Sequence, residues 1–94
     1  MIIATVQYSV TDREKVLELA VPFCEAGRKA KGNVEHRLWA TEKKDEIFAL
    51  EIWECMDDLK AFGTTDEAKA FKEGRAPYYL EETKITTIYE GNKK

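Results

Sequence analysis

His36 is the only imidazole in the chain, so it is the only side chain whose ordinary pKa suits acid–base chemistry near neutral pH. A histidine of this kind can take a proton from a bound hydroxyl group, which makes His36 a candidate catalytic residue. The structural alternative is a hydrogen-bonded or partly exposed histidine in a β-strand. Nothing near it in the sequence indicates a catalytic partner.

The remaining residue types predict no metal and no cofactor. The sequence has no glycine-rich phosphate loop and no cluster of histidines and carboxylates with metal-ligand spacing. Cys24 and Cys55 are thirty-one residues apart and form no CxxC pair, which argues against a disulfide framework or a zinc site. We expect both cysteines to be unreactive thiols packed in the interior.

The hydrophobic pattern predicts two helical regions set among four strands. A capping-box pattern at Thr11 and Glu14 begins a helix that is kinked at Pro22 and ends near Gly32. A second helical region is divided into two pieces by a new N-cap at Thr65. The predicted strands cover residues 2–8, 33–42, 47–53 and 83–90, and a polar tail follows at residues 91–94.

The strand at residues 47–53 is apolar on both faces, and only Glu51 interrupts the pattern. Its apolar side chains form two alternating sets: Phe48, Leu50 and Ile52 on one face, and Ile47, Ala49 and Trp53 on the other. The order βαββαβ predicts an α+β, ferredoxin-like fold with both helical regions on one face of a four-stranded antiparallel sheet. We expect a second copy of the sheet to cover the other face in a symmetric homodimer.

Length and charge restrict the remaining possibilities. The 94 residues predict a single domain spanning residues 1–94. A net charge of -3 gives no basic surface for a phosphate backbone, so we expect no nucleic-acid partner. The N-terminus lacks the features of a secretory signal, and no stretch is long and apolar enough to span a bilayer. A cytoplasmic protein without a membrane partner is therefore expected.

Three segments carry a resemblance to a known family: KGNVEHRLW at residues 31–39, FALEIWE at residues 48–54, and DDLKAF…AKAF at residues 57–71. In these segments the chain resembles the antibiotic-biosynthesis monooxygenase (ABM) family of the dimeric α+β barrel superfamily. The resemblance covers almost the whole chain and implies a dimeric α/β barrel. Because the superfamily contains several activities, it is more specific for the fold than for the reaction.

The chain departs from the family pattern at positions where relatives carry functional side chains. Phe62 and Glu67 stand where many relatives have histidines in and after the helix that follows the Glu-x-Trp strand. The haem-degrading branch has an Asn, a Trp and an iron-binding His at three positions where this chain has Gln7, Phe62 and Lys72. Without that axial histidine, haem degradation is not expected.

The resemblance adds further candidate site residues. Trp53 matches the family's strand tryptophan and could stack on an aromatic substrate, although an inward-facing Trp is more often part of the core. Glu51 lies on the same face, where a carboxylate could bind substrate, pair across strands or reach a dimer partner. A ligand cleft between the sheet and the second helical region could be lined by Gln7, Phe62, Phe71, Tyr78 and Tyr79, for which ordinary packing is the alternative.

Two functions follow as hypotheses. The first is a monooxygenase without a cofactor, which oxidises a small aromatic hydroxyl compound of quinol, phenol or anthrone type with O2, and which would use His36 and Trp53 as catalytic residues. The alternative is a non-catalytic dimer of the same fold that binds or senses a small molecule. A ferredoxin-like RNA-binding module is not favoured, because the third strand lacks the basic and aromatic residues for base stacking.

Overall fold

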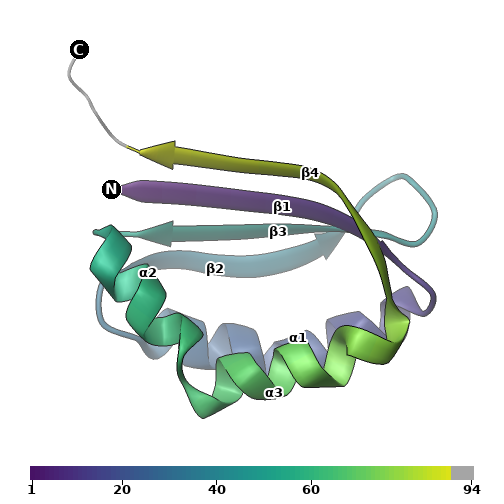
Figure 1. Cartoon of the computed structure of the whole chain (residues 1–94), viewed down its shortest axis with the longest axis horizontal. Helices are drawn as coiled ribbons and strands as arrows, with labels where there is room; N and C mark the ends of the chain where they lie inside the picture. The colour runs from purple at the N-terminus through teal and green to yellow at the C-terminus, as the bar shows by residue number, and fades with distance from the viewer. Residues whose placement is uncertain (90–94) are drawn as a thin grey trace.

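The computed structural model describes residues 1–89, which form a β-sheet with all of its helices on one face (Figure 1). In chain order the elements are β1 (Ile2–Val10), α1 (Arg13–Lys29), β2 (Asn33–Ala40), β3 (Glu46–Trp53), α2 (Met56–Gly63), α3 (Asp66–Arg75), the 3₁₀ turn η1 (Ala76–Tyr78) and β4 (Tyr79–Tyr89). The four strands are antiparallel in the order β2-β3-β1-β4. The predicted ferredoxin-like α+β fold is confirmed.

The helix boundaries differ slightly from those predicted. The cap of α1 is Asp12 and not Thr11, because the Asp12 carboxylate accepts a 3.1 Å hydrogen bond from the Lys15 backbone N–H. The helix continues through Pro22. As predicted, Thr65 separates α2 from α3, and its hydroxyl accepts a hydrogen bond from the Ala68 N–H.

The fourth strand begins four residues earlier than predicted, at Tyr79. Two register shifts in its pairing with β1 let the strand run on past Tyr8, so that Tyr79 pairs with Val10. The predicted end of this strand at Glu90 and the predicted tail at residues 91–94 lie outside the described residues.

The core lies between the helices and one face of the sheet. Successive strand residues alternate between faces, and the buried apolar residues of β3, Ile47 and Trp53, belong to the set that faces the helices. The core cluster consists of Tyr8, Val10, Val16, Ala20, Cys24, Ile47 and Phe71. The strand at residues 47–53 is apolar on both faces, and α1 and α3 cover the face that contains Ile47.

Helix α1 approaches β2 closely at Gly27. A Cβ atom at this position would lie 2.5 Å from the imidazole ring of His36, a distance that side chains do not tolerate. The absence of a side chain therefore lets α1 lie directly on His36.

The two cysteines differ in their surroundings. Cys24 is buried in the core, and burial raises the pKa of its thiol, as expected of a packing residue. Cys55 is exposed, and its Sγ lies 3.3 Å from a carboxylate oxygen of Asp58. The prediction that both are interior thiols is wrong for Cys55, because it precedes α2 at the end of the sheet and not inside it.

No helix of the described chain covers the second face of the sheet (Figure 1). By strand alternation and register, this face contains Ile3, Phe48, Leu50, Ile52, Trp39 and Ile88. The last two remain 40% and 51% exposed. None of the described helices is both long and apolar enough to cross a membrane.

Candidate functional site

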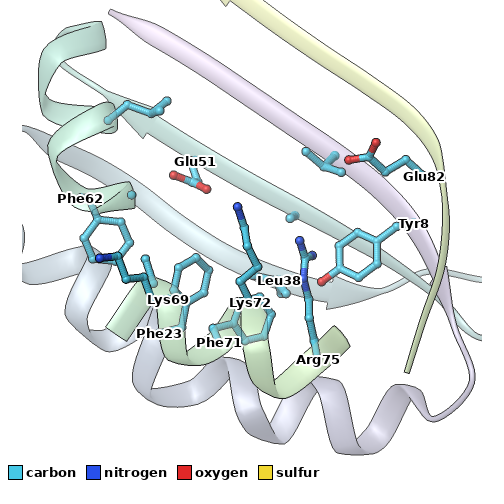
Figure 2. A pocket seen from close by; sticks show the side chains of 15 residues that line it. Tyr8, Phe23, Leu38, Glu51, Phe62, Lys69, Phe71, Lys72, Arg75 and Glu82 are labelled. Atoms are coloured by element: carbon cyan, nitrogen blue, oxygen red, sulfur yellow. The ribbon is translucent and has the colours of Figure 1, made fainter. Parts of the chain in front are cut away.

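A cavity of about 260 Å³ lies between the sheet and helices α2 and α3 (Figure 2). Its lining, which is largely apolar and includes four aromatic rings, and its size suit a small aromatic molecule. The lining residues are Val6, Tyr8, Phe23, Leu38, Ala49, Glu51, Leu59, Phe62, Gly63, Ala68, Lys69, Phe71, Lys72, Arg75 and Glu82. A second hollow, between α1 and β2, is more open to solvent.

Glu51 brings a carboxylate to the sheet side of this cavity. Its Oε1 accepts a 2.9 Å hydrogen bond from the indole Nε1–H of Trp53 and lies 3.6 Å from Nε2 of His36. β3 places Glu51 directly across from His36 on β2, and 29% of the Glu51 side chain remains exposed. One carboxylate is thus hydrogen-bonded to the Trp53 ring, lies beside the His36 ring and is open on the cavity side.

His36 is fully buried beneath the cavity and does not line it. Its ring packs edge-on against Phe23, Phe62 and Trp53, with ring centroids 4.6, 5.2 and 6.2 Å away. Within the part of the chain that the structure describes, neither ring nitrogen makes a hydrogen bond of good geometry. His36 therefore reaches the cavity only through Glu51.

Burial lowers the pKa of His36 below its ordinary value of 6.5, because the apolar surroundings penalise the charged imidazolium. The nearby carboxylates of Glu51 and Glu35 act in the opposite direction, and the Arg28 guanidinium adds to the lowering. The imidazole is thus held in its neutral form near pH 7.

Three phenylalanines from different helices form the aromatic wall. Phe23 of α1 stacks on Phe71 of α3 with ring centroids 4.5 Å apart and planes inclined by 10°. Phe62 of α2 lies 5.6 Å from Phe23 and 5.5 Å from the ring of Trp53. This wall provides apolar contacts for a planar ligand.

Tyr8 and Arg75 lie at the end of the cavity away from α2 (Figure 2). The Arg75 guanidinium lies over the rings of Tyr8, Tyr79 and Phe71, at 4.8, 5.0 and 5.4 Å from their centroids. Burial raises the pKa of the Tyr8 hydroxyl, and the charge of Arg75 partly opposes that change. Arg75 is therefore fixed in position by aromatic contacts.

The structure brings only some of the predicted site residues together. Glu51, Phe62 and Phe71 line the cavity, whereas Trp53 and His36 lie buried beside it. Neither His36 nor Trp53 lines the cavity, and the catalytic roles predicted for them stay predictions.

The other predicted cleft residues lie elsewhere. Gln7 is on the opposite face of the sheet, where its amide lies 3.5 Å from Glu46, because odd-numbered residues of β1 point away from the helices. Tyr78 lies in η1, and Tyr79 packs on Tyr8, 5.3 Å between ring centroids, without lining the cavity. The prediction that these three residues line the cleft is therefore wrong for this structure.

The prediction also missed three cations that line the cavity. Lys69, Lys72 and Arg75 recur at intervals of three residues along α3. Side chains three or four residues apart share a helix face, so this spacing could have been recognised in the sequence. Among residues 1–89, no group of three or more His, Cys, Asp or Glu side chains could hold a metal ion.

Residues 1–74 match the family described as antibiotic biosynthesis monooxygenase. The chain belongs to this family. The match includes β1 through most of α3, and therefore nearly all of the cavity lining, Glu51 and Lys72 among it. No curated protein sequence matches the chain closely enough to count as a relative.

Solved structures share the fold of this ABM family member at low sequence identity. A conserved protein of unknown function from Bacteroides thetaiotaomicron, described as a possible oxidoreductase, has 20% identity and a TM-score of 0.81, covering 93% of this chain and 94% of its own. A protein described as antibiotic biosynthesis monooxygenase has 15% identity, a TM-score of 0.79 and 94% coverage of both chains. Rv0793 from Mycobacterium tuberculosis has 11% identity and a TM-score of 0.80, covering 95% of this chain and 94% of its own.

The buried neutral state of His36 predicts a specific pH dependence of stability. In the unfolded chain His36 takes up a proton near pH 6.5, whereas the folded chain does so only at lower pH. Between these pH values the unfolded state binds more protons, so the free energy of unfolding falls as the pH is lowered. For one proton the slope is at most about 1.4 kcal/mol per pH unit.

Urea denaturation between pH 7 and pH 5 measures this slope for the wild type and for His36→Asn. We expect the wild type to lose stability more steeply than the variant, whatever their difference at pH 7. Since the chain has no other histidine, equal slopes would contradict the neutral buried state.

Proposed function

We propose that this ABM family member is a monooxygenase that needs no bound cofactor and oxidises a small aromatic hydroxyl compound of quinol, phenol or anthrone type. The observation that carries the proposal is the Glu51 carboxylate, held by Trp53 and facing a cavity with an aromatic wall. Membership of the family supports the reaction class.

In such a reaction the substrate supplies all four electrons that reduce O2. A quinol gives a hydroxyquinone and water: one oxygen atom replaces a ring hydrogen, and the other leaves as water with the displaced hydrogens. For an anthrone, a CH2 group becomes a carbonyl with release of water. The task of the protein is to bind the ring, exclude water and remove the first proton, which makes the substrate electron-rich enough to react with O2.

Glu51 is the group that takes this proton, because it is the carboxylate that both lines the cavity and is anchored from below. Trp53 and His36 are positioning residues: the indole N–H orients one carboxylate oxygen, and the neutral imidazole packs beside it. This assignment replaces the sequence-based hypothesis that His36 itself is the base, since its ring is sealed from the cavity.

The second candidate is a dimer that binds or senses a small molecule without catalysis. The observation that favours it is Phe62, which occupies a position where the family resemblance implies histidine and instead packs against the buried ring of His36. Oxygen uptake separates the two functions, because a sensing protein would bind a quinol without consuming O2.

We also propose that two copies of the chain associate through the uncovered face of the sheet. Apolar patches of this kind on a small domain mark interaction surfaces, and the apolar residues Phe48, Leu50 and Ile52 extend across β3 on that face. Because the two faces of a homodimer are identical, packing sheet against sheet would cover both patches at once.

Glu51→Gln tests the proposed proton acceptor. The amide oxygen can still accept the Trp53 N–H, so the fold is retained, but the side chain can no longer take up a proton. We expect the rate of oxygen uptake with a panel of quinols to fall by about 100-fold or more. The control is Glu54→Gln, which removes an exposed carboxylate just after the end of β3. This variant should leave the rate unchanged.

An oxygen electrode measures this rate after subtraction of autoxidation without protein. Wild-type protein that consumes no O2 with any quinol, or a Glu51→Gln variant that is as fast as the wild type, would contradict the proposal. In the first case the sensing dimer becomes the better account.

Sedimentation equilibrium tests the proposed dimer. We expect the wild type to sediment at twice the chain mass of 10.8 kDa. Leu50→Glu should shift it toward the monomer, because a charge would then be buried in the interface. Val21→Glu, on the exposed side of α1, should not. A wild type that remains monomeric at micromolar concentration would refute the proposal.

A further inference from the structure

We propose that the cavity selects aromatic ligands that carry a carboxylate in addition to the reacting hydroxyl group. The inference deepens the proposed function and rests on it for the role of the hydroxyl. It is carried by the three cations of α3, Lys69, Lys72 and Arg75, which line a cavity that is otherwise largely apolar.

These cations enter the cavity from one helix face. Their spacing of three residues places them in a row along α3, and Figure 2 shows Lys72 and Arg75 extending from the helix into the space below the sheet. Phe71, which lies between Lys69 and Lys72 in sequence, packs into the core. The row is therefore held against the cavity by the same packing that fixes α3.

The two lysines lack partners within the described chain. Among residues 1–89, the side-chain amino groups of Lys69 and Lys72 form no ion pair and no hydrogen bond. The carboxylates in the lining, Glu51 and Glu82, come from the sheet, and Glu51 is already engaged with Trp53. Amino groups beside an apolar cavity are therefore available for an anionic ligand.

The charge of the cavity is opposite to that of the protein. The chain has a net charge of -3, yet the lining has three cations against two carboxylates. The cationic lining is thus not a by-product of a basic surface. It raises the local concentration of anions in the cavity, an effect that apolar walls strengthen.

The charges also give the ligand an orientation. A ligand carboxylate next to Glu51 would be repelled. One beside Lys72 and Arg75 on the α3 side of the cavity would be attracted, because Glu82, the other lining carboxylate, comes from the sheet side (Figure 2). Arg75 is fixed over Tyr8, Phe71 and Tyr79, so its planar guanidinium is already ordered for a carboxylate. The carboxylate end of the ligand therefore lies toward α3 and Arg75, which leaves the hydroxyl end for Glu51.

Two probes of equal size test the selection: para-hydroxybenzoate and its neutral counterpart para-hydroxybenzamide. Binding is measured by NMR titration at low ionic strength. We expect the wild type to bind the benzoate at least about fivefold more tightly than the benzamide, the effect of one or two partly exposed ion pairs. Raising the salt concentration should reduce this preference, because partly exposed charges are screened.

The matched variants are Lys69→Gln with Lys72→Gln, and Lys43→Gln with Lys44→Gln. Each removes two positive charges, the first pair from the cavity and the second from the exposed turn between β2 and β3. We expect the first double variant to lose the preference for the benzoate and the second to retain it.

Equal binding of the two probes to the wild type, or binding of neither, overturns the inference. Equal loss of preference in both double variants does so as well, because it would reflect net charge alone. Failure of the proposed function is distinguishable: a protein that consumes no O2 but prefers the benzoate through Lys69 and Lys72 still has the anion-selective cavity.

Discussion

A single carboxylate, Glu51, interrupts the apolar helix-facing side of β3, and a charge in that place must be paired or remain in contact with water. The structure meets both needs. The Trp53 indole donates to one oxygen from within the core, and the cavity keeps the other side of the carboxylate open. The site thus consists of one polar residue on the otherwise apolar helix-facing side of β3, with the aromatic wall and α3 packed around it.

The same constraint explains how the chain can depart from the family pattern. Phe62 of α2 stands where the resemblance implies a histidine. The ring of His36, on β2, packs against it with ring centroids 5.2 Å apart. Gly27 allows α1 to seal that ring from above, which lowers the pKa of His36 and keeps it neutral. An imidazole is therefore still near this part of the site, but it supports Glu51 and does not reach a ligand.

Much of the fold could be predicted because the alternation along β3 and the cap at Thr65 are local signals. The cavity could not, since it depends on which set of alternating residues in β1 faces the helices. Both sets contain apolar residues, so the sequence does not show that Gln7 points away and Tyr8 points inward. The pairing of His36 with Glu51 depends on the register shift between Asn33 and Glu35, for which the sequence has no clear signal.

The central claim is that Glu51 meets the ligand's hydroxyl while Trp53 holds the carboxylate from behind. The indole N–H signals of the two tryptophans test it in one NMR spectrum, with hydroquinone added in the absence of oxygen. The Trp53 signal should shift and saturate, because its N–H donates to the carboxylate that the ligand contacts. The Trp39 signal should stay in place, since that ring packs on Phe48 on the other face of the sheet. A saturable shift of Trp39 with Trp53 unmoved would contradict the account.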